Sequence, residues 1–480
     1  MTFVRREQTG KTFIIHTNQE RITNMQKIIP DDIVELTKMF TENHFELYLV
    51  GGCVRDFIMN TKPHDWDICT NATPKQVLTL AEAYGLKCFT TGMPYGTIQV
   101  IINDKIYEIT TYRTETSYSD GRHPDSIKFA SDLTTDLSRR DFTINAIAMN
   151  PVTRCIADPY AGSVDIIYRR LCAVGNPDER LKEDALRILR ALRFAIKYDM
   201  LINTDLAAAI HKNRNLLSAD TGCVSRERVT DELMKIFATG KPVARIFTEY
   251  RDVIAVLFPE IEKTFDFNQN NKYHKHEVYE HMLAVVDNCK TTDPVIKLAA
   301  LLHDIGKPDA YAEDEEGHGH FYGHPKISAE IAGPMLKKQL RLSNANYERA
   351  MELIEFHDDT PAPTVKAVRR AAYRHGAAFM CDWFILRQAD MDDHIYPDSS
   401  HTDDMNTVKE LFAATIETQL FTRKDLAING KDLMSRLGLK PGRQIGRIIE
   451  TLVNEAVDGN VANNKKALLA RAAQIIEREV

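Results

Sequence analysis

The feature that most constrains this chain is a short apolar run, Leu47–Val50, that ends in the glycine pair Gly51-Gly52. An apolar run bounded by glycines is typical of a buried strand, and the following segment, Val54–Met59, has the pattern of a helix. The N-terminus of such a helix presents free N–H groups and the positive end of its dipole, and Arg55 adds a positive charge. We therefore expect an anion-binding turn.

Two carboxylates, Asp65 and Asp67, follow this turn in the segment Asp65–Cys69, which we predict to be a strand. Residues two apart on a strand face the same side, so both side chains should point in one direction. Two carboxylates on one face can hold Mg²⁺ against a nucleotide triphosphate, as metal-assisted nucleotidyl transfer requires. Each motif alone is more often structural, but their combination favours a phosphoryl-transfer site.

Other phosphate-binding motifs are excluded. Gly10-Lys11-Thr12 resembles the end of a P-loop, but Arg5 stands where that motif needs its first glycine. No dinucleotide-binding glycine pattern follows a predicted strand.

Composition limits the class of protein. The 480 residues are 44% hydrophobic and 27% charged, which is typical of a globular chain of roughly three domains. The net charge of -7 means that any contact with nucleic acid must come from local basic patches. The eight scattered cysteines, without a C-x-x-C pair, indicate reduced thiols. With no membrane-spanning run and no signal peptide, we expect a cytoplasmic protein with no membrane contact; no protein partner is evident.

The hydropathy pattern predicts an α+β fold. Thr97–Ile102 and Lys105–Tyr112 are predicted strands joined by a turn at Asn103-Asp104, and Pro74–Tyr84 is a predicted helix capped by Thr73. From about residue 177 strand signals vanish and helical periodicity dominates.

We therefore expect a small mixed-sheet head followed by an all-helical remainder. The predicted divisions are an N-terminal extension (1–26), the head (27–150), a helical neck (151–270), a histidine-rich domain (271–395) and a helical tail (396–480). A linker is expected at Pro259–Asn271, where the helical pattern is interrupted.

Two polar segments of the head and neck are candidate functional elements. Arg113–Ile127 has almost no apolar residues, which predicts a mobile loop carrying Asp120 and Arg122. Further on, Arg139-Arg140-Asp141 directly precedes an apolar segment. Either Arg140 contacts a triphosphate and Asp141 a ribose, or these residues form a charged helix cap.

A predicted helix from Glu183 to Tyr198 carries the clearest indication of substrate. Asp184, Arg187, Arg190 and Arg193 recur every third residue between apolar positions. A solvated arginine face is the usual explanation. Because the helix is apolar over much of its surface, we expect some of these arginines to be enclosed and paired.

Asp184 and Arg187 place a hydrogen-bond acceptor beside a fork of donors. Cytosine and adenine offer a donor beside an acceptor and match this order, whereas guanine and uracil offer the reverse. Unpaired buried polar groups cost about 1–3 kcal/mol each, so two mismatches would reject the wrong base. A protein side-chain pair can thus select CTP and ATP without a nucleic-acid template.

Together these motifs resemble the class II CCA-adding tRNA nucleotidyltransferases and the related bacterial poly(A) polymerases. The resemblance runs in order from about residue 45 to 240 through Gly51–Asp56, Asp65–Asp67, Arg139–Ala146, Asp158–Gly162, Glu183–Arg187 and Ser225–Lys235. It implies template-independent addition of CCA to the 3′ end of tRNA from CTP and ATP, with release of pyrophosphate. The loop Tyr118–Pro124 resembles the family's flexible loop, associated with the switch from C to A addition.

The resemblance also implies roles for individual residues. Asp65 and Asp67 are the expected catalytic ligands of Mg²⁺, and Glu108, on the adjacent predicted strand, is a candidate third catalytic carboxylate. The residues expected to bind the incoming nucleotide are Gly52, Arg55, Arg140, Asp184, Arg187, Arg190 and Arg193.

The histidine-rich domain resembles the HD-domain phosphohydrolases. Leu301–Lys307 matches their signature, and the residues that match their metal ligands are His281, His303, Asp304 and Asp390. This donor set suits Mn²⁺, Fe, Ni²⁺ or Zn²⁺, so a transition metal is expected in addition to Mg²⁺. His324 and His357 lie where some members keep further ligands. A satisfied structural histidine is the alternative for each single residue.

Three rival functions follow from the same residues. A poly(A) polymerase would not incorporate CTP, and an HD-type metal-dependent phosphohydrolase acting on RNA ends, such as 2′,3′-cyclic phosphates, would not add nucleotides. A non-catalytic RNA-binding protein is disfavoured because both carboxylates are present. The tail resembles the family's RNA-contacting region, where Lys440 and Arg443 in the turn Leu437–Gly446 either grip a phosphate or simply join two helices.

Overall fold

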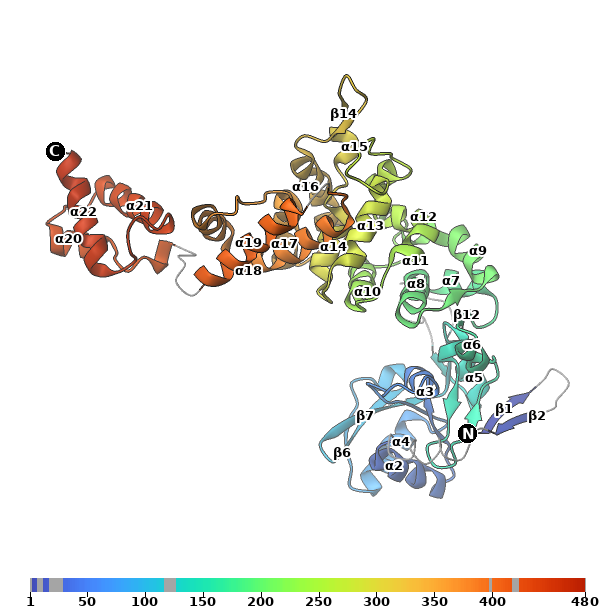
Figure 1. Ribbon diagram of the computed structural model, residues 1–480. Coiled ribbons are helices and arrows are strands. Elements are labelled where there is room, and N and C mark those ends of the chain that lie inside the picture. The colour runs from blue at the N-terminus through green and yellow to red at the C-terminus, as the bar shows by residue number, and fades with distance from the viewer. Residues whose placement is uncertain are drawn as a thin grey trace. The chain divides into compact units, whose positions relative to one another are not determined.

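The computed structural model describes residues 2–6, 12–16, 29–115, 127–396, 399–416 and 423–479 (Figure 1). The chain forms two compact units, one of residues 1–239 with 249–257 and one of residues 240–248 with 258–480. The first unit is α+β and the second is mostly helical, which confirms the predicted fold class. Most of the polar loop Arg113–Ile127, including Asp120 and Arg122, lies outside the described residues, as does its segment Tyr118–Pro124.

The head is built on a nine-stranded mixed sheet in the order β2-β1-β11-β10-β3-β4-β7-β6-β5. The pairs β4–β7 and β1–β11 are parallel and the others are antiparallel. Its strands are β1 Thr2–Arg6, β2 Thr12–His16, β3 Leu47–Val50, β4 Asp67–Thr70, β5 Lys87–Phe89, β6 Thr97–Ile102, β7 Lys105–Thr111, β10 Ala148–Met149 and β11 Ile156–Ala157.

The predicted hairpin and capped helix are both confirmed. Asn103 and Asp104 join β6 to β7 with φ of 48° and 61°, the left-handed conformation that tight hairpin turns require. Helix α4 (Pro74–Ala83) begins after Thr73, whose side chain accepts from Gln76 N while Gln76 caps it in return.

The strand predicted at Asp65–Cys69 begins two residues late. In the β3–β4 ladder Leu49 pairs with Ile68, and β3 then ends at Val50 because the backbone turns at Gly51 with φ 74°. The first residues of β4 in its ladders with β3 and β7 are Ile68 and Asp67, so Asp65 and Trp66 lie in the loop before β4. The helix expected at Val54–Met59 begins earlier than predicted, so that α3 spans Gly52–Ile58 directly after the turn.

The helix expected from Glu183 to Tyr198 is two helices. Helix α7 (Pro177–Glu183) ends before Asp184, whose φ of -146° and ψ of 102° are extended, and α8 spans Leu186–Tyr198. Asp184 accepts a hydrogen bond from the N–H of Leu186 at 3.1 Å, so it caps α8 instead of continuing α7. Aspartate favours such capping positions over helix interiors.

The first unit contains further helices, which are α2 Asp31–Glu42, α5 Leu133–Ser138, α6 Gly162–Ile167, α9 Thr204–Asn213, α10 Arg226–Ala238 and α12 Arg251–Leu257. Helix α11, Ala244–Glu249, belongs to the second unit except for its last residue. The prediction that strands vanish after about residue 177 is wrong for very short pairs. These are β13 Leu201–Ile202, which pairs with the earlier β12 Arg170–Leu171, and β14 Ala312–Glu313, which pairs with β15 Gly319–His320. The pair of β8 Arg113–Glu115 with β9 Ile127–Phe129 precedes residue 177 and does not bear on this prediction.

The second unit consists mainly of helices, which are α13 Val278–Asn288, α14 Pro294–Leu302, α15 Lys307–Ala310, α16 His324–Pro334, α17 Asn344–Phe356, α18 Val365–Asp393, α19 Ser400–Thr415, α20 Gly430–Leu437, α21 Arg443–Val457 and α22 Lys465–Glu479. Helix α18 breaks at Gly376, which has φ 84°. The expected linker at Pro259–Asn271 contains a 3₁₀ helix, Pro259–Thr264, with Ile261 buried. Among the described residues no helix is both long and apolar enough to cross a membrane.

The tail has its own apolar core, formed by Leu433 of α20, Ile448 and Leu452 of α21, and Leu468 of α22. The predicted glycine-rich turn into a helix is confirmed, since α20 ends at Gly438 with φ 69° and α21 begins at Arg443. The eight cysteines are free thiols, as predicted.

A buried ion pair fastens α8 to the head. Asp141 is 8% exposed, and its Oδ2 accepts from Arg190 Nε at 2.9 Å, while its Oδ1 accepts from Asn145 and from the N–H of Phe142. Burial raises the pKa of Asp141, but Arg190 and these hydrogen bonds outweigh it and hold the pKa at about 2. These bonds hold Asp141 firmly within the fold, and its contact with a ribose stays a prediction.

Replacing Asp141 by Asn should destabilise the first unit by about 3 kcal/mol, because it leaves Arg190 partly buried without its counter-charge. For a unit of this size the transition midpoint should fall by about 6–12 °C in differential scanning calorimetry. The control is Asp199→Asn, which removes an ion pair whose side chains are 67% and 74% exposed and should cost less than about 1 kcal/mol. Equal shifts for both variants would contradict this assignment.

Candidate functional site

The three predicted carboxylates lie together in the head. Asp65, Asp67 and Glu108 line one cavity of about 660 Å³. Asp67 and Glu108 are partners across the parallel β4–β7 ladder, and Asp65 joins them from the loop before β4. Partial desolvation, together with the charges of Asp65 and Glu108, raises the pKa of Asp67, although Arg140 and Arg55 oppose the shift. A cluster of oxygen ligands that repel one another is suited to a divalent cation such as Mg²⁺.

Gln99 was not predicted, yet it orients Glu108. It lies opposite Glu108 in the β6–β7 ladder and donates from Nε2 to Glu108 Oε1 at 2.7 Å. That Gln99 lies opposite Glu108 follows only from the residue pairing of the β6–β7 hairpin.

The glycine turn lies directly beside the carboxylates. A Cβ added to Gly51 would lie 2.8 Å from Arg140 Nη1 and 3.7 Å from Asp67 Oδ2, and Gly51 has φ 74°. A side chain there would be strained and would displace the guanidinium. The turn therefore brings a bare backbone between the guanidinium of Arg140 and the carboxylate of Asp67, where a phosphate can approach it closely.

Arg140 is positioned by a residue that the sequence analysis missed. Asp136 is fully buried in α5 and pairs with Arg139 at 2.8 Å and with Arg140 at 3.2 Å. Burial raises the pKa of Asp136, but the two guanidinium groups outweigh it and lower the value. An acid three and four residues before an arginine pair is the signal that could have identified it.

Arg55 is largely enclosed. It is 6% exposed, and its guanidinium donates to Asn145 at 2.6 Å and to Asp56 at 2.8 Å while lying 4.5 Å from the ring centre of Tyr198. These contacts connect the start of α3 to α8. Direct contact between Arg55 and a nucleotide stays a prediction.

Asp184 and Arg187 lie at the junction of α7 and α8, and each has partners within the chain. Asp184 accepts from Arg228 at 2.9 Å. Arg187 is 7% exposed; it donates to Glu183 at 2.7 Å and to the carbonyl of Arg139 at 3.3 Å. Because Arg139 directly precedes Arg140, this last contact places Arg187 beside the segment that carries Arg140.

The remaining arginines of α8 are paired, as the apolar surroundings predicted. Arg190 binds Asp141, and Arg193 binds the buried Glu232 of α10. Both guanidinium groups also lie over the ring of Phe194, at 5.3 Å and 4.5 Å. These pairs hold α8 against α10 and the head.

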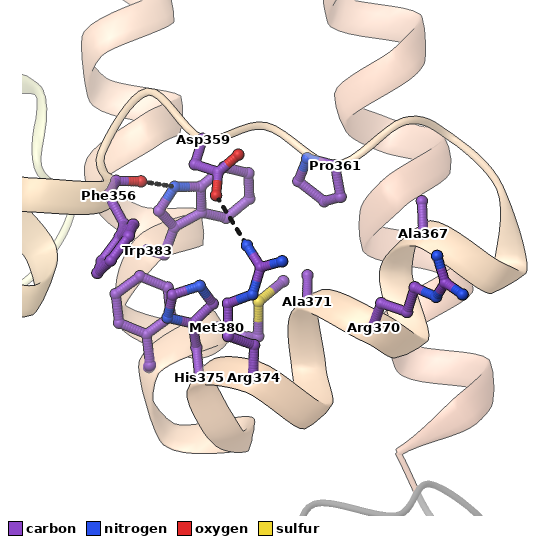
Figure 2. Close-up of a pocket in the computed structure, with 11 residues that line it drawn as sticks. Phe356, Asp359, Pro361, Ala367, Arg370, Ala371, Arg374, His375, Met380 and Trp383 are labelled. Carbon is purple, nitrogen blue, oxygen red and sulfur yellow. Dashed lines mark hydrogen bonds and ion pairs between the residues drawn. The ribbon is translucent and has the colours of Figure 1, made fainter. Parts of the chain in front are cut away.

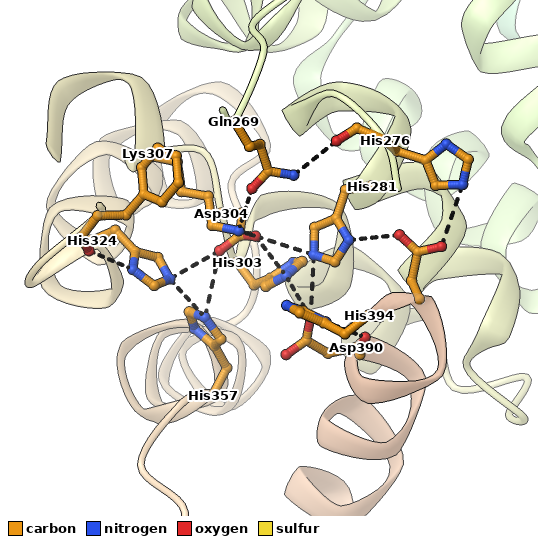
Figure 3. A network of polar contacts seen from close by, with 12 residues as sticks. Gln269, His276, His281, His303, Asp304, Lys307, His324, His357, Asp390 and His394 are labelled. Atoms are coloured by element: carbon orange, nitrogen blue, oxygen red, sulfur yellow. Dashed lines mark hydrogen bonds and ion pairs between the residues drawn. The ribbon is translucent and has the colours of Figure 1, made fainter. Parts of the chain in front are cut away.

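The second unit brings the predicted histidine and aspartate ligands together (Figure 3). His281 Nε2 lies 3.2 Å from both Asp304 Oδ2 and Asp390 Oδ1, and His303 Nε2 lies 3.2 Å from Asp304 Oδ2. All four side chains are buried, and they come from α13, the end of α14 and α18.

Asp304 faces two groups of histidines. While Oδ2 faces His281 and His303, Oδ1 lies 3.0 Å from His324 Nε2 and 3.6 Å from His357 Nε2. The two sets His281–His303–Asp304 and Asp304–His324–His357 each have the spacing of a metal site.

The donor atoms fit a divalent transition metal. The Nδ1 atoms of His303, His324 and His357 each contact a backbone carbonyl, at 2.8 Å, 2.9 Å and 2.8 Å, which fixes the rings with Nε2 toward the cluster. Among the described side chains, His281 Nε2, His303 Nε2 and Asp304 Oδ1 are buried without a hydrogen-bond partner. Imidazole nitrogens and carboxylate oxygens in this arrangement match the ligands of Mn²⁺, Fe, Ni²⁺ or Zn²⁺.

Residues that were not predicted support this cluster. Asp393 Oδ2 lies 2.8 Å from His281 Nδ1, and Lys307 Nζ donates to Asp304 Oδ2 at 2.7 Å. Burial lowers the pKa of His281, but the nearby carboxylates of Asp304, Asp390 and Asp393 outweigh this and raise the value to about 10. The position of Asp393, three residues after Asp390, could have indicated it.

A smaller cavity of about 200 Å³ lies in the bend of α18 (Figure 2). Trp383 forms part of its wall and donates from Nε1 to the carbonyls of Phe356 and His357, both at 3.1 Å. Arg374 and Asp359 pair across its rim at 3.5 Å. These contacts fix the loop after α17 and so position the ring of His357.

Known proteins resemble this chain along most of its length. Residues 47–172 match the family model of the poly A polymerase head domain, residues 199–264 match the probable RNA and SrmB-binding site of polymerase A, and residues 325–472 match a putative domain 2 of tRNA nucleotidyltransferase. The CCA-adding enzyme of Limosilactobacillus reuteri is 31% identical over 435 residues, covering 90% of this chain and 94% of the relative. The chain belongs to the CCA-adding enzyme family.

Further members of the family match nearly the whole chain. The CCA-adding enzyme of Ligilactobacillus salivarius is 29% identical over 462 residues, covering 94% of this chain and 99% of the relative. The structure of the CCA-adding enzyme of Bacillus stearothermophilus in complex with CTP has a TM-score of 0.64 and 24% identity, covering 94% of this chain and 98% of that one. The Thermotoga maritima enzyme complexed with tRNA has a TM-score of 0.57 and 18% identity, covering 95% and 98%. At these identities the two structures establish the shared fold.

Gly51→Ala should weaken the binding of CTP and ATP about tenfold or more, measured by isothermal titration calorimetry, because a methyl group at φ 74° is strained and displaces Arg140. Gly85→Ala is a matched control, since Gly85 has φ 70° but its added Cβ meets nothing within 4 Å. Both variants should lose similar stability, whereas only Gly51→Ala should lose nucleotide affinity. A parallel loss of affinity in Gly85→Ala would contradict the role of the turn.

Proposed function

We propose that this protein adds CCA to the 3′ end of tRNA from CTP and ATP, without a nucleic-acid template and with release of pyrophosphate. The observation that supports this most is the meeting of three carboxylates, Asp65, Asp67 and Glu108, with the Gly51 turn and Arg140. The same unit presents Asp184 and Arg187 close to Arg139. The protein is proposed to act in the cytoplasm on tRNA, CTP and ATP.

The catalytic roles follow from this arrangement. Asp65, Asp67 and Glu108 would hold Mg²⁺, which supplies charge neutralisation at the triphosphate and lowers the pKa of the attacking hydroxyl. The backbone at Gly51 and Gly52 and the guanidinium of Arg140 would bind the triphosphate. The 3′ oxygen of the tRNA attacks the α-phosphorus as the bond to pyrophosphate breaks, and the hydroxyl proton leaves to solvent or a neighbouring carboxylate.

The neck residues would select the base. Asp184 and Arg187 are held by Arg228 and Glu183, so their acceptor and donor are oriented before a nucleotide arrives. The base edge of cytosine or adenine can replace some of the hydrogen bonds that Asp184 and Arg187 make to Arg228 and Glu183. Guanine and uracil present the wrong order of donors and acceptors for this exchange. Arg55, Arg190 and Arg193 would contribute to nucleotide binding through their positive charge. Arg190 and Arg193 would also contribute by holding α8 in place through their ion pairs with Asp141 and Glu232.

The test is addition of labelled nucleotides to tRNA that lacks its last three bases. The unmodified protein should add CMP and then AMP, whereas Asp67→Asn should lower the rate about 1000-fold, since losing metal-assisted charge stabilisation costs about 4 kcal/mol. Glu82→Gln, an exposed acid at the end of α4, should not change the rate. Arg187→Ala should admit GTP and UTP. Addition of AMP alone would identify a poly(A) polymerase instead, and equal use of all four nucleotides would refute the selection mechanism.

A second function is favoured by the histidine cluster. We propose that His281, His303, Asp304 and Asp390 bind a transition metal, with His324 and His357 as further ligands, and that this site acts as a phosphohydrolase on RNA ends. Two observations support it. The Nε2 atoms of His281 and His303 are buried without a hydrogen-bond partner. An adjoining cavity of about 320 Å³ is lined by Lys307 and Arg387, two cations suited to a phosphate. The tail, with Lys440 and Arg443 exposed at the start of α21, is proposed to contact RNA.

The purified protein should contain Mn, Fe, Ni or Zn when analysed by inductively coupled plasma mass spectrometry. His303→Asn should remove most of this metal, since a lost ligand or ligand partner lowers affinity at least about 10- to 100-fold. His318→Asn, an exposed histidine outside the cluster, should leave the metal content unchanged. Nucleotide addition should survive His303→Asn. Unchanged metal content in His303→Asn would refute the site.

A further inference from the structure

The cavity beside the three carboxylates extends away from the glycine turn. Besides the acids, its lining consists of Pro30, His64, Trp66, Lys105, Ile106 and Tyr107, and neither Gly51 nor Arg140 belongs to it. Asp67 therefore separates two regions of the head. Its carboxylate lies close to Gly51 on one side and borders this cavity on the other.

The direction of the reaction assigns these two regions to different substrates. In nucleotidyl transfer the attacking oxygen and the leaving pyrophosphate lie roughly in line on opposite sides of the α-phosphorus. If the triphosphate occupies the side of Gly51 and Arg140, the attacking 3′-hydroxyl must approach from the side of the cavity. This step rests on the proposed function.

The lining of the cavity is unusual for a surface beside three acids. Ile106 is 55% exposed and shares its face of β7 with Glu108, two residues further on. The partly buried Trp66 lies between Asp65 and Asp67 in the loop. Exposed apolar groups next to charged ones favour a ligand with a flat apolar face.

The cavity also has a cation placed away from the acids. Lys105 follows the hairpin turn, its side chain is 61% exposed, and its Nζ lies 3.1 Å from the buried Asp32. Tyr107 also donates to Asp32, at 2.9 Å. Asp32 thus holds a lysine at the edge of the cavity, where a backbone phosphate of RNA can reach it.

We propose that this cavity is the subsite for the 3′-terminal nucleotide of the tRNA, in which Trp66 stacks on the base, Ile106 supports the base or ribose, and Lys105 binds the phosphate. The terminal base changes after each addition, so the subsite must accept different bases. Stacking and phosphate contacts tolerate any base, whereas hydrogen bonds to base edges do not. The cavity would thus bind the end of any polynucleotide, whereas Asp184 and Arg187 would select the base of the incoming nucleotide.

The test compares Trp66→Ala, Trp66→Phe and the control Phe89→Ala, an aromatic residue of β5 that is 49% exposed and lies outside the cavity. Trp66→Ala should raise the KM for tRNA about tenfold or more while the KM for CTP stays the same. Trp66→Phe keeps an aromatic ring, so its KM for tRNA should stay close to that of the unmodified protein. Phe89→Ala should change neither constant. A change confined to the KM for CTP, or no change in either constant, would overturn the proposal.

A spectroscopic measurement separates stacking from a merely structural role. The chain contains two tryptophans, so a short RNA hairpin ending in the tRNA acceptor sequence, added without nucleotides, should quench fluorescence in the unmodified protein but not in Trp66→Phe. Binding of the same RNA is followed independently by anisotropy of a label on its 5′ end. Binding without a Trp66-dependent quench would overturn the subsite, whereas absence of nucleotide addition by the unmodified protein would instead refute the proposed function.

Discussion

The arrangement of the head depends on where one strand loses its partner. Strand β3 leaves the sheet at Gly51, so β4 can pair on both sides only from about Asp67 onward. This places an acid at the very start of β4, another in the free loop before it, and a third opposite on β7. The same backbone turn that ends β3 also brings Arg140 and bare peptide groups to these acids. The end of β3 and the clustering of charged groups are thus both consequences of the backbone turn at Gly51.

Enclosed arginines connect the head to α8. An arginine cannot be deprotonated in a protein, so burying its guanidinium requires a carboxylate or carbonyl partner nearby. Arg187, Arg190 and Arg193 find theirs in Glu183, Asp141 and Glu232, and Arg139 and Arg140 share Asp136. The guanidinium groups that we propose to bind the nucleotide are therefore held in place by carboxylates of the chain itself.

Much of the head was predictable because its signals are local. The hairpin at Asn103-Asp104, the capped helix after Thr73 and the run Leu47–Val50 each depend on neighbouring residues. The position of Asp65 outside β4 was not predictable, because it depends on β3 ending on the other side of the ladder. Nor was the break at Asp184, where capping of α8 competes with continuation of α7. Among the supporting residues, Asp136 and Asp393 had a local signal in their spacing from Arg139 and Asp390, whereas Gln99 becomes visible only from the register of the β6–β7 hairpin.

Among the described side chains, Asp304 is the one carboxylate that the two groups of histidines share. One of its oxygens faces His281 and His303, and the other faces His324 and His357. A cation on either side withdraws electron density from the shared carboxylate and so weakens its bond to a cation on the other. If metal ions bind on both sides, each would therefore change the affinity for the other through the single carboxylate of Asp304.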